Sequence, residues 1–357
     1  NDSIDPTPFF SLTENTRKKT VTLAVEEGPN KPYLYRGKAY RRSDTATVEV
    51  DNVELRRLVL AGQNMHFEEL PCHKQDLTFR ALEEKLEAEH VVKALNGDVL
   101  RTFNLFNFEA GFNNAALIVS DQNTFPGIDV ARFGESINII ADRATFEGTS
   151  VIEQIDGACT MFERYYSVET IEGARRATHY SIPYEAFREA VANAVAHRTW
   201  DVNAKIRIAM HPNRIEISSP GGLPAGLGRD EYLRGFISQL RNPILSNVLF
   251  RLNIIEMFGT GIVRIRSSYA EYEQKPEFDV SENAVRVTLP VTDARPALTS
   301  DEELVYRFVK EEGPTASGQI VANFNFGKDK AVNLLRSLVE KRYVEKTGTG
   351  RGTRYHA

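Results

Sequence analysis

The sequence predicts an α+β protein with several domains, and three observations support this prediction. The chain has 357 residues, whereas one domain usually contains roughly 100–200. Stretches with the alternating pattern of strands and stretches with helical spacing follow one another without an internal repeat. A segment rich in turn formers, residues 293–300, precedes the C-terminal stretch, whose predicted helices and hairpin form a separate unit. We expect four segments, at residues 1–70, 71–176, 177–292 and 299–357.

Charge and cysteine content narrow the class of protein. A formal net charge of −5 argues against wrapping nucleic acid with the whole surface, but it leaves room for a local basic patch. Cys72 and Cys159 match no metal-ligand spacing, which favours a reduced, cytoplasmic protein. No apolar run reaches the roughly eighteen residues of a membrane span, so we expect no membrane partner. The chain starts at Asn1 without a methionine or signal peptide, and we expect a further N-terminal part to precede it.

The first segment predicts strands, a hairpin and a short helix. Residues 20–25 alternate as a half-buried strand does, and residues 51–60 have helical spacing. Between them, basic residues are interleaved with tyrosines, a combination that can bind nucleic acid. The same pattern also fits a solvated hairpin tip whose aromatic rings pack inward. The basic residues are Arg36, Lys38, Arg41 and Arg42, and the tyrosines are Tyr33, Tyr35 and Tyr40.

The second segment predicts an α/β connecting domain without a catalytic constellation. Residues 79–90 and 149–166 have the spacing of amphipathic helices. Residues 114–120 form a continuous apolar run, which we interpret as a buried strand. Residues 127–133 and 136–140 are predicted to be neighbouring strands.

A helix with a polar stripe opens the third segment. Pro183 fits its first turn, and the helix is expected to continue to His197. Glu189, Asn193 and His197 recur every four residues and therefore share one face of the helix. A carboxylate and an amide one turn apart could hold a hydrated Mg²⁺ or activate a water molecule. The spacing taken alone favours a solvated helix face with weak contacts between residues four apart.

Turn-forming glycines follow that helix at two places. A predicted hairpin at residues 206–217 leads into a turn that contains Gly221 and Gly222. Asn242 is the expected N-cap of another helix. Further on, the stretch 259–261 precedes a helical run to residue 273. Glycines before a helix N-terminus allow backbone N–H groups to face an anion, although such pairs are more often plain turns.

The C-terminal segment predicts three helices followed by a hairpin, which is the order of a winged helix-turn-helix. The helices are expected at residues 301–311, 315–324 and 328–341, and the hairpin at residues 343–355. In the first and third helices, apolar residues recur at helical spacing and should face the core. They are Leu304, Val305, Phe308 and Val309, then Ala331, Leu334, Leu335, Leu338 and Val339.

Positive charge gathers on the predicted recognition helix and wing. Residues 326–357 contain eight basic and three acidic residues, a local balance of +5 in a chain of net charge −5. This contrast predicts contacts with the phosphates of double-stranded DNA, although a winged helix can also bind protein. The expected DNA-contacting residues are Lys328, Lys330, Asn333 and Arg336 on the helix, and Arg351 and Arg354 on the wing.

Several of these motifs together resemble a known family. Tyr184 to Tyr269 is similar to the RecG-helicase C-terminal-like module of the GHKL ATPase type, an α/β sandwich. The motifs are Phe187-Arg188-Glu189-Ala190-Val191-Ala192-Asn193-Ala194-Val195-Ala196-His197-Arg198, Ser219-Pro220-Gly221-Gly222-Leu223-Pro224, Ser238-Gln239-Leu240-Arg241-Asn242-Pro243 and Phe258-Gly259-Thr260-Gly261. Residues 1–70 resemble the end of a Schlafen AlbA-type domain, on the stretch Tyr35-Arg36-Gly37-Lys38-Ala39-Tyr40-Arg41-Arg42-Ser43. Members of the family are described as predicted transcriptional regulators.

The resemblance implies roles for residues in the third segment. In GHKL ATPases the helix supplies a general-base glutamate, here Glu189, and a Mg²⁺-binding asparagine, here Asn193. An aspartate normally bonds the adenine amino group, and Ser219 stands there instead. The long glycine-rich lid is reduced to three residues. The residues that would surround ATP are Asn193, His197, Ser219, Gly221, Gly222, Gly259, Thr260 and Gly261.

The sequence is compatible with three hypotheses about function. The first is a DNA-binding transcriptional regulator, expected to be a homo-oligomer and most simply a dimer, whose centre senses a ligand or joins two copies. The second is a Mg²⁺-dependent ATPase that acts on nucleic acid through Glu189 and Asn193. The third is an interaction scaffold with an inert GHKL-like core.

Overall fold

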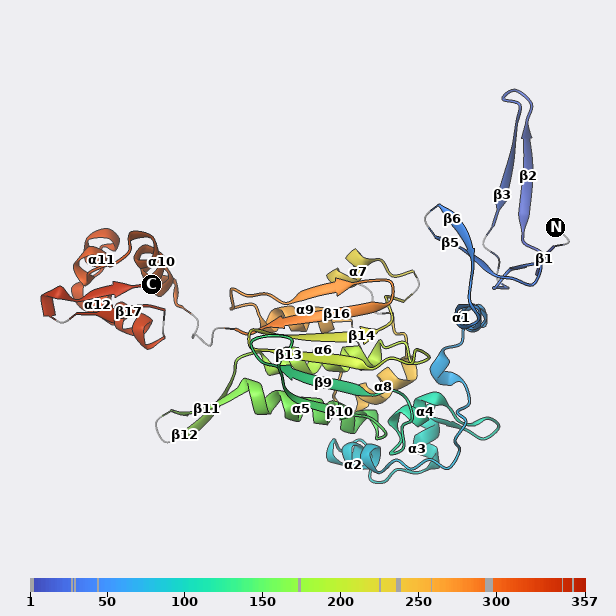
Figure 1. Cartoon of the computed structure of the whole chain (residues 1–357), viewed down its shortest axis with the longest axis horizontal. Helices are drawn as coiled ribbons and strands as arrows, with labels where there is room; N and C mark the ends of the chain where they lie inside the picture. The colour runs from blue at the N-terminus through green and yellow to red at the C-terminus, as the bar shows by residue number, and fades with distance from the viewer. Residues whose placement is uncertain are drawn as a thin grey trace.

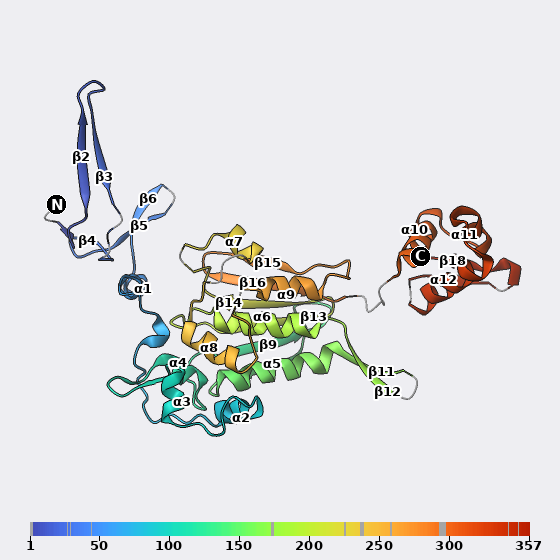
Figure 2. The same cartoon turned by 180° about the vertical axis from the view of Figure 1, so that it is seen from behind.

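A computed structural model describes most of the chain. The described residues are 3–26, 28, 30–43, 45–172, 175–224, 226–235, 239–257, 259–292, 298–341, 343–348 and 350–357. Two views show a central α/β body with β-hairpins at the N-terminal end and a separate helical domain at the C-terminal end (Figures 1 and 2). The predicted multidomain α+β fold is confirmed.

The N-terminal region consists of three small antiparallel pairs and one helix. Residues 20–25 form a strand, as predicted, but all six residues of that strand and of its partner are exposed. The prediction of a half-buried strand is therefore wrong, because alternation alone does not supply a covering layer. The elements are β1 (Ile4–Asp5), β2 (Phe10–Asn15), β3 (Thr20–Val25), β4 (Leu34–Tyr35), β5 (Tyr40–Ser43), β6 (Ala46–Glu49) and α1 (Asn52–Gly62).

The next region contains one clear correction. The apolar run at residues 114–120 is the buried helix α4 (Asn114–Val119), not a strand. Asn113 caps this helix, since its side-chain oxygen accepts the N–H of Ala116 at 3.0 Å. A short apolar run has no periodicity that separates a buried strand from a buried helix. The other elements here are η1 (Phe67–Glu69), α2 (Arg80–Ala88), α3 (Gly97–Thr102), β7 (Phe106–Asn107) and β8 (Gly111–Phe112).

A six-stranded mixed sheet organises the centre of the molecule. Its strand order is β10 (Ile140–Phe146), β9 (Ile128–Phe133), β13 (Ile206–His211), β14 (Arg214–Pro220), β16 (Ala284–Pro290) and β15 (Glu277–Val280). Only the pair β9 and β13 is parallel. The strand predicted at residues 136–140 is displaced, because β10 starts at Ile140. The second and third predicted segments therefore share one sheet and one core.

Helices cover one face of this sheet (Figures 1 and 2). They are α5 (Val151–Tyr166), α6 (Tyr184–Ala196), α8 (Pro243–Arg251) and α9 (Gly261–Ser268), with the shorter α7 (Arg229–Arg234) nearby. Between α5 and α6 the chain forms the hairpin β11 (Ser167–Glu172) and β12 (Arg175–Tyr180). Phe162 of α5 stacks on Phe187 of α6 with their ring centroids 4.2 Å apart. This buried packing fixes which face of α6 points away from α5.

The C-terminal domain has a hydrophobic core of its own. Its elements are α10 (Ser300–Glu312), α11 (Ser317–Phe324), α12 (Lys328–Glu340), β17 (Glu345–Thr347), η2 (Gly350–Gly352) and β18 (Arg354–His356), in the predicted order. Thr315 pairs with Tyr355 of β18 through two backbone hydrogen bonds of 2.9 Å. Leu304, predicted to face the core, is 48% exposed, because the inner face of α10 is filled by its neighbours. Of the predicted linker, residues 293–297 lie outside the described residues.

Candidate functional site

Two residues of the polar stripe of α6, Glu189 and Asn193, form a hydrogen bond with each other. Asn193 donates its side-chain N–H to Glu189 Oε1 at 3.0 Å. Glu189 is only 4% exposed, and this burial raises the pKa of its carboxyl group, while the hydrogen bond from Asn193 opposes the rise. The two residues therefore form an internal pair, and the predicted solvated helix face is wrong for Glu189.

The first turn of α9 lies directly against this pair. A Cβ atom placed on Gly261 would lie 2.5 Å from Asn193 Nδ2 and 2.7 Å from Glu189 Oε1. Only glycine allows the backbone of α9 to come so near. The carboxylate of Glu189 thus faces the N-terminal end of a helix, where partial positive charge favours an anion. With 4% of its surface exposed, Glu189 has little contact with solvent.

His197 follows the last residue of α6 and is half-buried as a residue. Its backbone N–H donates to the Asn193 carbonyl at 3.0 Å. Burial, with a contribution from the positive charge of Arg241, lowers the pKa of His197 to about 4. The imidazole is therefore neutral at pH 7 and offers one donor and one acceptor.

Ser219 has already committed its hydroxyl proton. The hydroxyl donates to the Ala194 carbonyl of α6 at 2.7 Å, and the residue is 6% exposed. Only its oxygen lone pairs remain for a ligand. The ionised carboxylate that the resemblance expects here would accept a stronger, charge-assisted hydrogen bond.

The predicted phosphate-binding glycines serve packing at the end of β14. Gly221 has a φ of +103°, and a Cβ there would lie 1.9 Å from Thr199 Oγ1. Its N–H donates to the Asn283 carbonyl at 2.8 Å and is not available to an anion. A Cβ on Gly222 would lie 2.3 Å from the Glu282 carbonyl oxygen. These positions require glycine because two backbone segments meet there.

A narrow cavity of about 90 Å³ brings most of the predicted residues together. Glu189 and Thr260 are absent from its described lining, so the supposed general base does not face the cavity. The lining includes Asn193, His197, Ser219, Gly221, Gly222, Gly259 and Gly261 among the predicted residues, and also Ala190, Ala194, Ile217, Leu223, Pro224, Leu227, Tyr232, Gly235, Gln239, Leu240, Ile255, Glu256, Ile262, Val285 and Val287. Phe258 and Ser238, which belong to the resembling motifs, lie outside the described residues.

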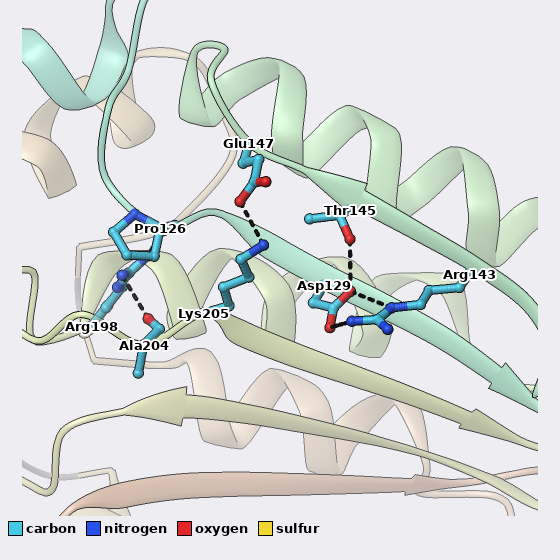
Figure 3. Close-up of polar contacts among 8 residues, drawn as sticks. All are labelled: Pro126, Asp129, Arg143, Thr145, Glu147, Arg198, Ala204 and Lys205. Atoms are coloured by element: carbon cyan, nitrogen blue, oxygen red, sulfur yellow. Dashed lines mark hydrogen bonds and ion pairs between the residues drawn. The ribbon is translucent and has the colours of Figure 1, made fainter. Parts of the chain in front are cut away.

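A buried arginine, missed from the sequence, holds the loop after α6. Arg198 has no exposed surface and donates to the carbonyls of Pro126 and, at 2.7 Å, Ala204 (Figure 3). Its guanidinium lies 4.3 Å from the centroid of the Trp200 ring. Burial lowers its pKa to about 10, so it stays charged at pH 7. The figure also shows Asp129 paired with Arg143, and Lys205 with Glu147. The sequence gives no signal that separates Arg198 from a surface arginine.

The start of α8 is held by an unexpected residue. Asn242 occupies the predicted N-cap position, but it makes no side-chain cap bond. Its amide instead donates to the carbonyls of Ala196 and Arg198 at 2.9 and 2.8 Å. Glu68, which is fully buried, accepts the N–H groups of Ile244 and Leu245 at 2.5 and 2.8 Å. Burial raises the pKa of Glu68 to about 7.

The basic cluster of the N-terminal region is partly neutralised. Lys38 pairs with Glu49 at 2.7 Å, and Arg41 pairs with Glu282 at 3.0 Å. Arg42 donates to Thr47 Oγ1, and Arg36 lies over the ring of Tyr35. Tyr35 and Tyr40 are 43% and 42% exposed, so they do not pack inward.

The basic residues of the C-terminal domain differ in what they contact. Lys330 pairs with Asp301 at 2.7 Å and lies over the Phe326 ring. In the described part of the chain, the exposed Lys328, Asn333 and Arg336 have no hydrogen-bond or ion-pair partner. Arg354 is exposed as well. The side chain of Arg351 and all of Arg342 lie outside the described residues.

Comparisons with known proteins support the central module. Residues 203–289 match the sequence model of a family described as "putative ATP-dependent DNA helicase recG C-terminal". The match starts after α6, so Glu189, Asn193 and His197 lie outside it in sequence. The predicted RecG C-terminal-like module is confirmed over the matched residues, which is consistent with ATP and Mg²⁺ as ligands. No curated protein matches the chain.

A solved structure has a similar fold. It is the crystal structure of the DIP2311 protein from Corynebacterium diphtheriae, with a TM-score of 0.56 and 17% sequence identity. The similarity covers 100% of this chain and 77% of that one. Among the described residues, no helix has both the length and the apolar surface needed to cross a bilayer. The same residues contain no group of three His, Cys, Asp or Glu side chains placed to hold a metal ion.

Proposed function

We propose that this chain, whose residues 203–289 belong to the RecG C-terminal-like family, is a cytoplasmic, dimeric DNA-binding transcriptional regulator. Its C-terminal domain is the DNA-contacting part, and its central module does not hydrolyse ATP. The proposal combines the free polar surface of α12 with the closed pair of Glu189 and Asn193.

The pairing of Thr315 with Tyr355 carries the proposal. It adds a short strand between α10 and α11 to the hairpin of β17 and β18. The order helix, strand, helix, helix and hairpin is that of a winged helix-turn-helix. In such domains the last helix enters the major groove and the hairpin lies along the DNA backbone. Here these elements are α12 and the loop between β17 and β18.

The outward face of α12 is suited to contacts with DNA at a few positions. Ala331, Leu335 and Leu338 are buried, so the opposite face presents Asn333 and Arg336. Asparagine can bond adenine and arginine can bond guanine in two-point contacts. Asp329 and Glu340 are exposed on the same face and repel phosphate. Because Lys330 is paired within the domain, Lys328, Arg336 and Arg354 carry more of the phosphate contacts than the charge count suggests.

The centre supports binding of a ligand without hydrolysis. Glu189 is sealed behind Gly261 and absent from the cavity lining, while Ser219 replaces the adenine-binding carboxylate. The first feature keeps the carboxylate of Glu189 away from the cavity, and the second weakens recognition of adenine. Tight, Mg²⁺-dependent ATP binding in titration calorimetry, with turnover lost on Glu189→Ala, would instead favour the ATPase hypothesis.

DNA binding by the full chain tests the proposal directly. We expect the affinity for a mixed pool of duplexes to fall with salt, with a slope of log affinity against log salt near about −4. Arg336→Ala should weaken binding by roughly tenfold, since one charged contact to DNA contributes about 1–3 kcal/mol. Lys310→Ala is the matched control, because it removes one exposed charge from α10 of the same domain. Salt-independent binding, or equal effects of both variants, would contradict the proposal. Sedimentation with and without DNA tests the dimer.

A further inference from the structure

An open hollow of about 570 Å³ lies where three loops of the central body meet. Two of these loops precede β9 and β13 and the third follows β10, so the hollow sits at one end of three neighbouring strands. It shares no described lining residue with the cavity beside α6. Sites for small molecules usually have volumes of about 300–1,000 Å³, which makes this hollow large enough for a small metabolite.

Two lysines line the hollow, and they differ in what balances their charge. Lys205 pairs with Glu147 at 2.5 Å, as Figure 3 shows. Lys74, from the segment before α2, donates to the side-chain oxygen of Gln122 at 3.1 Å, and that oxygen belongs to a neutral amide. Among the described residues, no carboxylate pairs with Lys74. The hollow therefore keeps one uncompensated positive charge at its surface.

A second positive charge, that of Arg198, lies directly behind the wall. Arg198 has no exposed surface and donates to the carbonyls of Pro126, which lines the hollow, and of Ala204, which precedes Lys205 (Figure 3). In the described part of the chain, no carboxylate pairs with its guanidinium, and its Nε has no hydrogen-bond partner. A buried charge without a counter-ion is costly, so an anion in the hollow would be stabilised by it.

The number of uncompensated charges favours one kind of anion. A phosphate monoester carries a charge of about −1.5 to −2 at pH 7, whereas each phosphate of a DNA backbone carries only one negative charge. Lys74 and Arg198 together match the monoester. Thr124 and Asn203 of the lining are exposed, and their side chains form no hydrogen bond within the described residues. Hydroxyl and amide groups of this kind can bond the hydroxyl groups of a ligand.

We propose that this hollow binds a small phosphate monoester that carries hydroxyl groups, with its phosphate beside Lys74 and against the wall that Arg198 supports. The site is formed by the central body and goes beyond the proposed DNA contact. The two proposals are therefore tested separately.

The fluorescence of Trp200 tests the class of ligand. It is the single tryptophan of the chain, and its ring packs on Phe125 of the lining, with 5.8 Å between centroids, and on Arg198. Titration of the full chain with ribose 5-phosphate should give a saturable change and, in calorimetry, one site with a Kd below about 1 mM. Ribose should not bind, and duplex DNA should not displace the sugar phosphate. Absence of saturable binding in both measurements, equal binding of ribose, or displacement by DNA would overturn the proposal.

Three variants test the location. Lys74→Gln removes one charge from the hollow and should weaken binding roughly tenfold, since a hydrogen bond to a charged group is lost. Lys93→Gln removes the same charge from an exposed position between α2 and α3 and should have no effect. Glu147→Gln releases Lys205 and should strengthen binding, a gain that a damaged fold cannot produce. Unchanged affinity in Lys74→Gln or Glu147→Gln, or an equal loss in Lys93→Gln, would refute the assignment.

Discussion

The polar faces of α6 and α12 have similar spacing in the sequence but opposite situations in the structure. On α6, Asn193 bonds Glu189 and both lie beneath α9. On α12, Asn333 and Arg336 are exposed and have no partner among the described residues. A polar group satisfied inside the protein stabilises the fold, whereas one left in water is free to bind another molecule. The two helices differ because α9 packs on the polar face of α6, whereas the polar face of α12 is exposed. The spacing of residues along a helix does not predict which segment will pack on it.

Two buried carboxylates give the central body and the C-terminal domain opposite responses to pH. Burial raises the pKa of Glu68 to about 7. Glu302 is 4% exposed and is held by Lys341 at 2.7 Å and by Ser337 and Thr299, so its pKa is lowered to about 2 despite burial. A raised pKa in the fold means stability that is full below the unfolded value and lost as pH rises. A lowered pKa means the reverse.

We therefore expect the central body to lose up to about 3 kcal/mol between pH 4.5 and 7.5, and the C-terminal domain to lose stability only below pH 4.5. Hydrogen exchange of amides in α8 and α12 across this range separates the two responses. Glu68→Gln should reduce the pH dependence of the stability of the central body and leave that of the C-terminal domain unchanged. A loss of protection in α8 on acidification from pH 7 would show that the buried Glu68 is ionised without penalty.

Substitutions at two glycines test whether α9 packs directly on Glu189 and Asn193 of α6. Gly261 and Gly97 are both the first residue of a helix, but a Cβ on Gly97 meets no atom within 4 Å. Gly261→Ala should cost about 1–3 kcal/mol, since neither Asn193 nor Glu189 can move without losing its partner. Gly97→Ala should be neutral or slightly stabilising. Equal melting temperatures for the two variants would mean that α9 does not press on the pair.

Two asparagines, Asn193 of α6 and Asn333 of α12, should respond differently to replacement by alanine. Asn193→Ala leaves the buried Glu189 without its donor and should cost about 1–3 kcal/mol. His197→Ala should cost less, because its ring makes no hydrogen bond within the described part of the chain. Asn333→Ala should leave the melting temperature unchanged and weaken DNA binding instead. A stable Asn193→Ala protein would restore the solvated face as the better description of α6.

The sequence predicts those features that depend on a local pattern of residues. It does not predict those that depend on contacts between segments distant in the chain. The helices α5 and α12 and the hairpin of β13 and β14 follow from periodicity, since each buries one face, whereas α6 is buried on most sides. The helix α4 did not, because a fully buried run has no polar side to mark its period. In the site, the motifs located the right residues but not their partners. That Gly261 closes over Glu189, and that Lys330 is occupied by Asp301, depends on segments distant in sequence.

The smallest expected effect concerns the wing, where two arginines test whether exposed charge acts on DNA or only keeps the domain soluble. Arg354 is exposed near the end of the hairpin, and Arg351 lies in the loop before it. Replacing both with alanine should flatten the salt dependence of DNA binding by roughly two in slope, without changing the preferred sequence, because phosphate contacts carry no sequence information. The matched control replaces Arg307 and Lys310 of α10, which removes the same charge from another face of the domain. Gel-shift titrations at several salt concentrations measure both slopes. Since a nonspecific change in net charge would flatten both equally, only a difference between the two variants identifies the wing as a DNA contact.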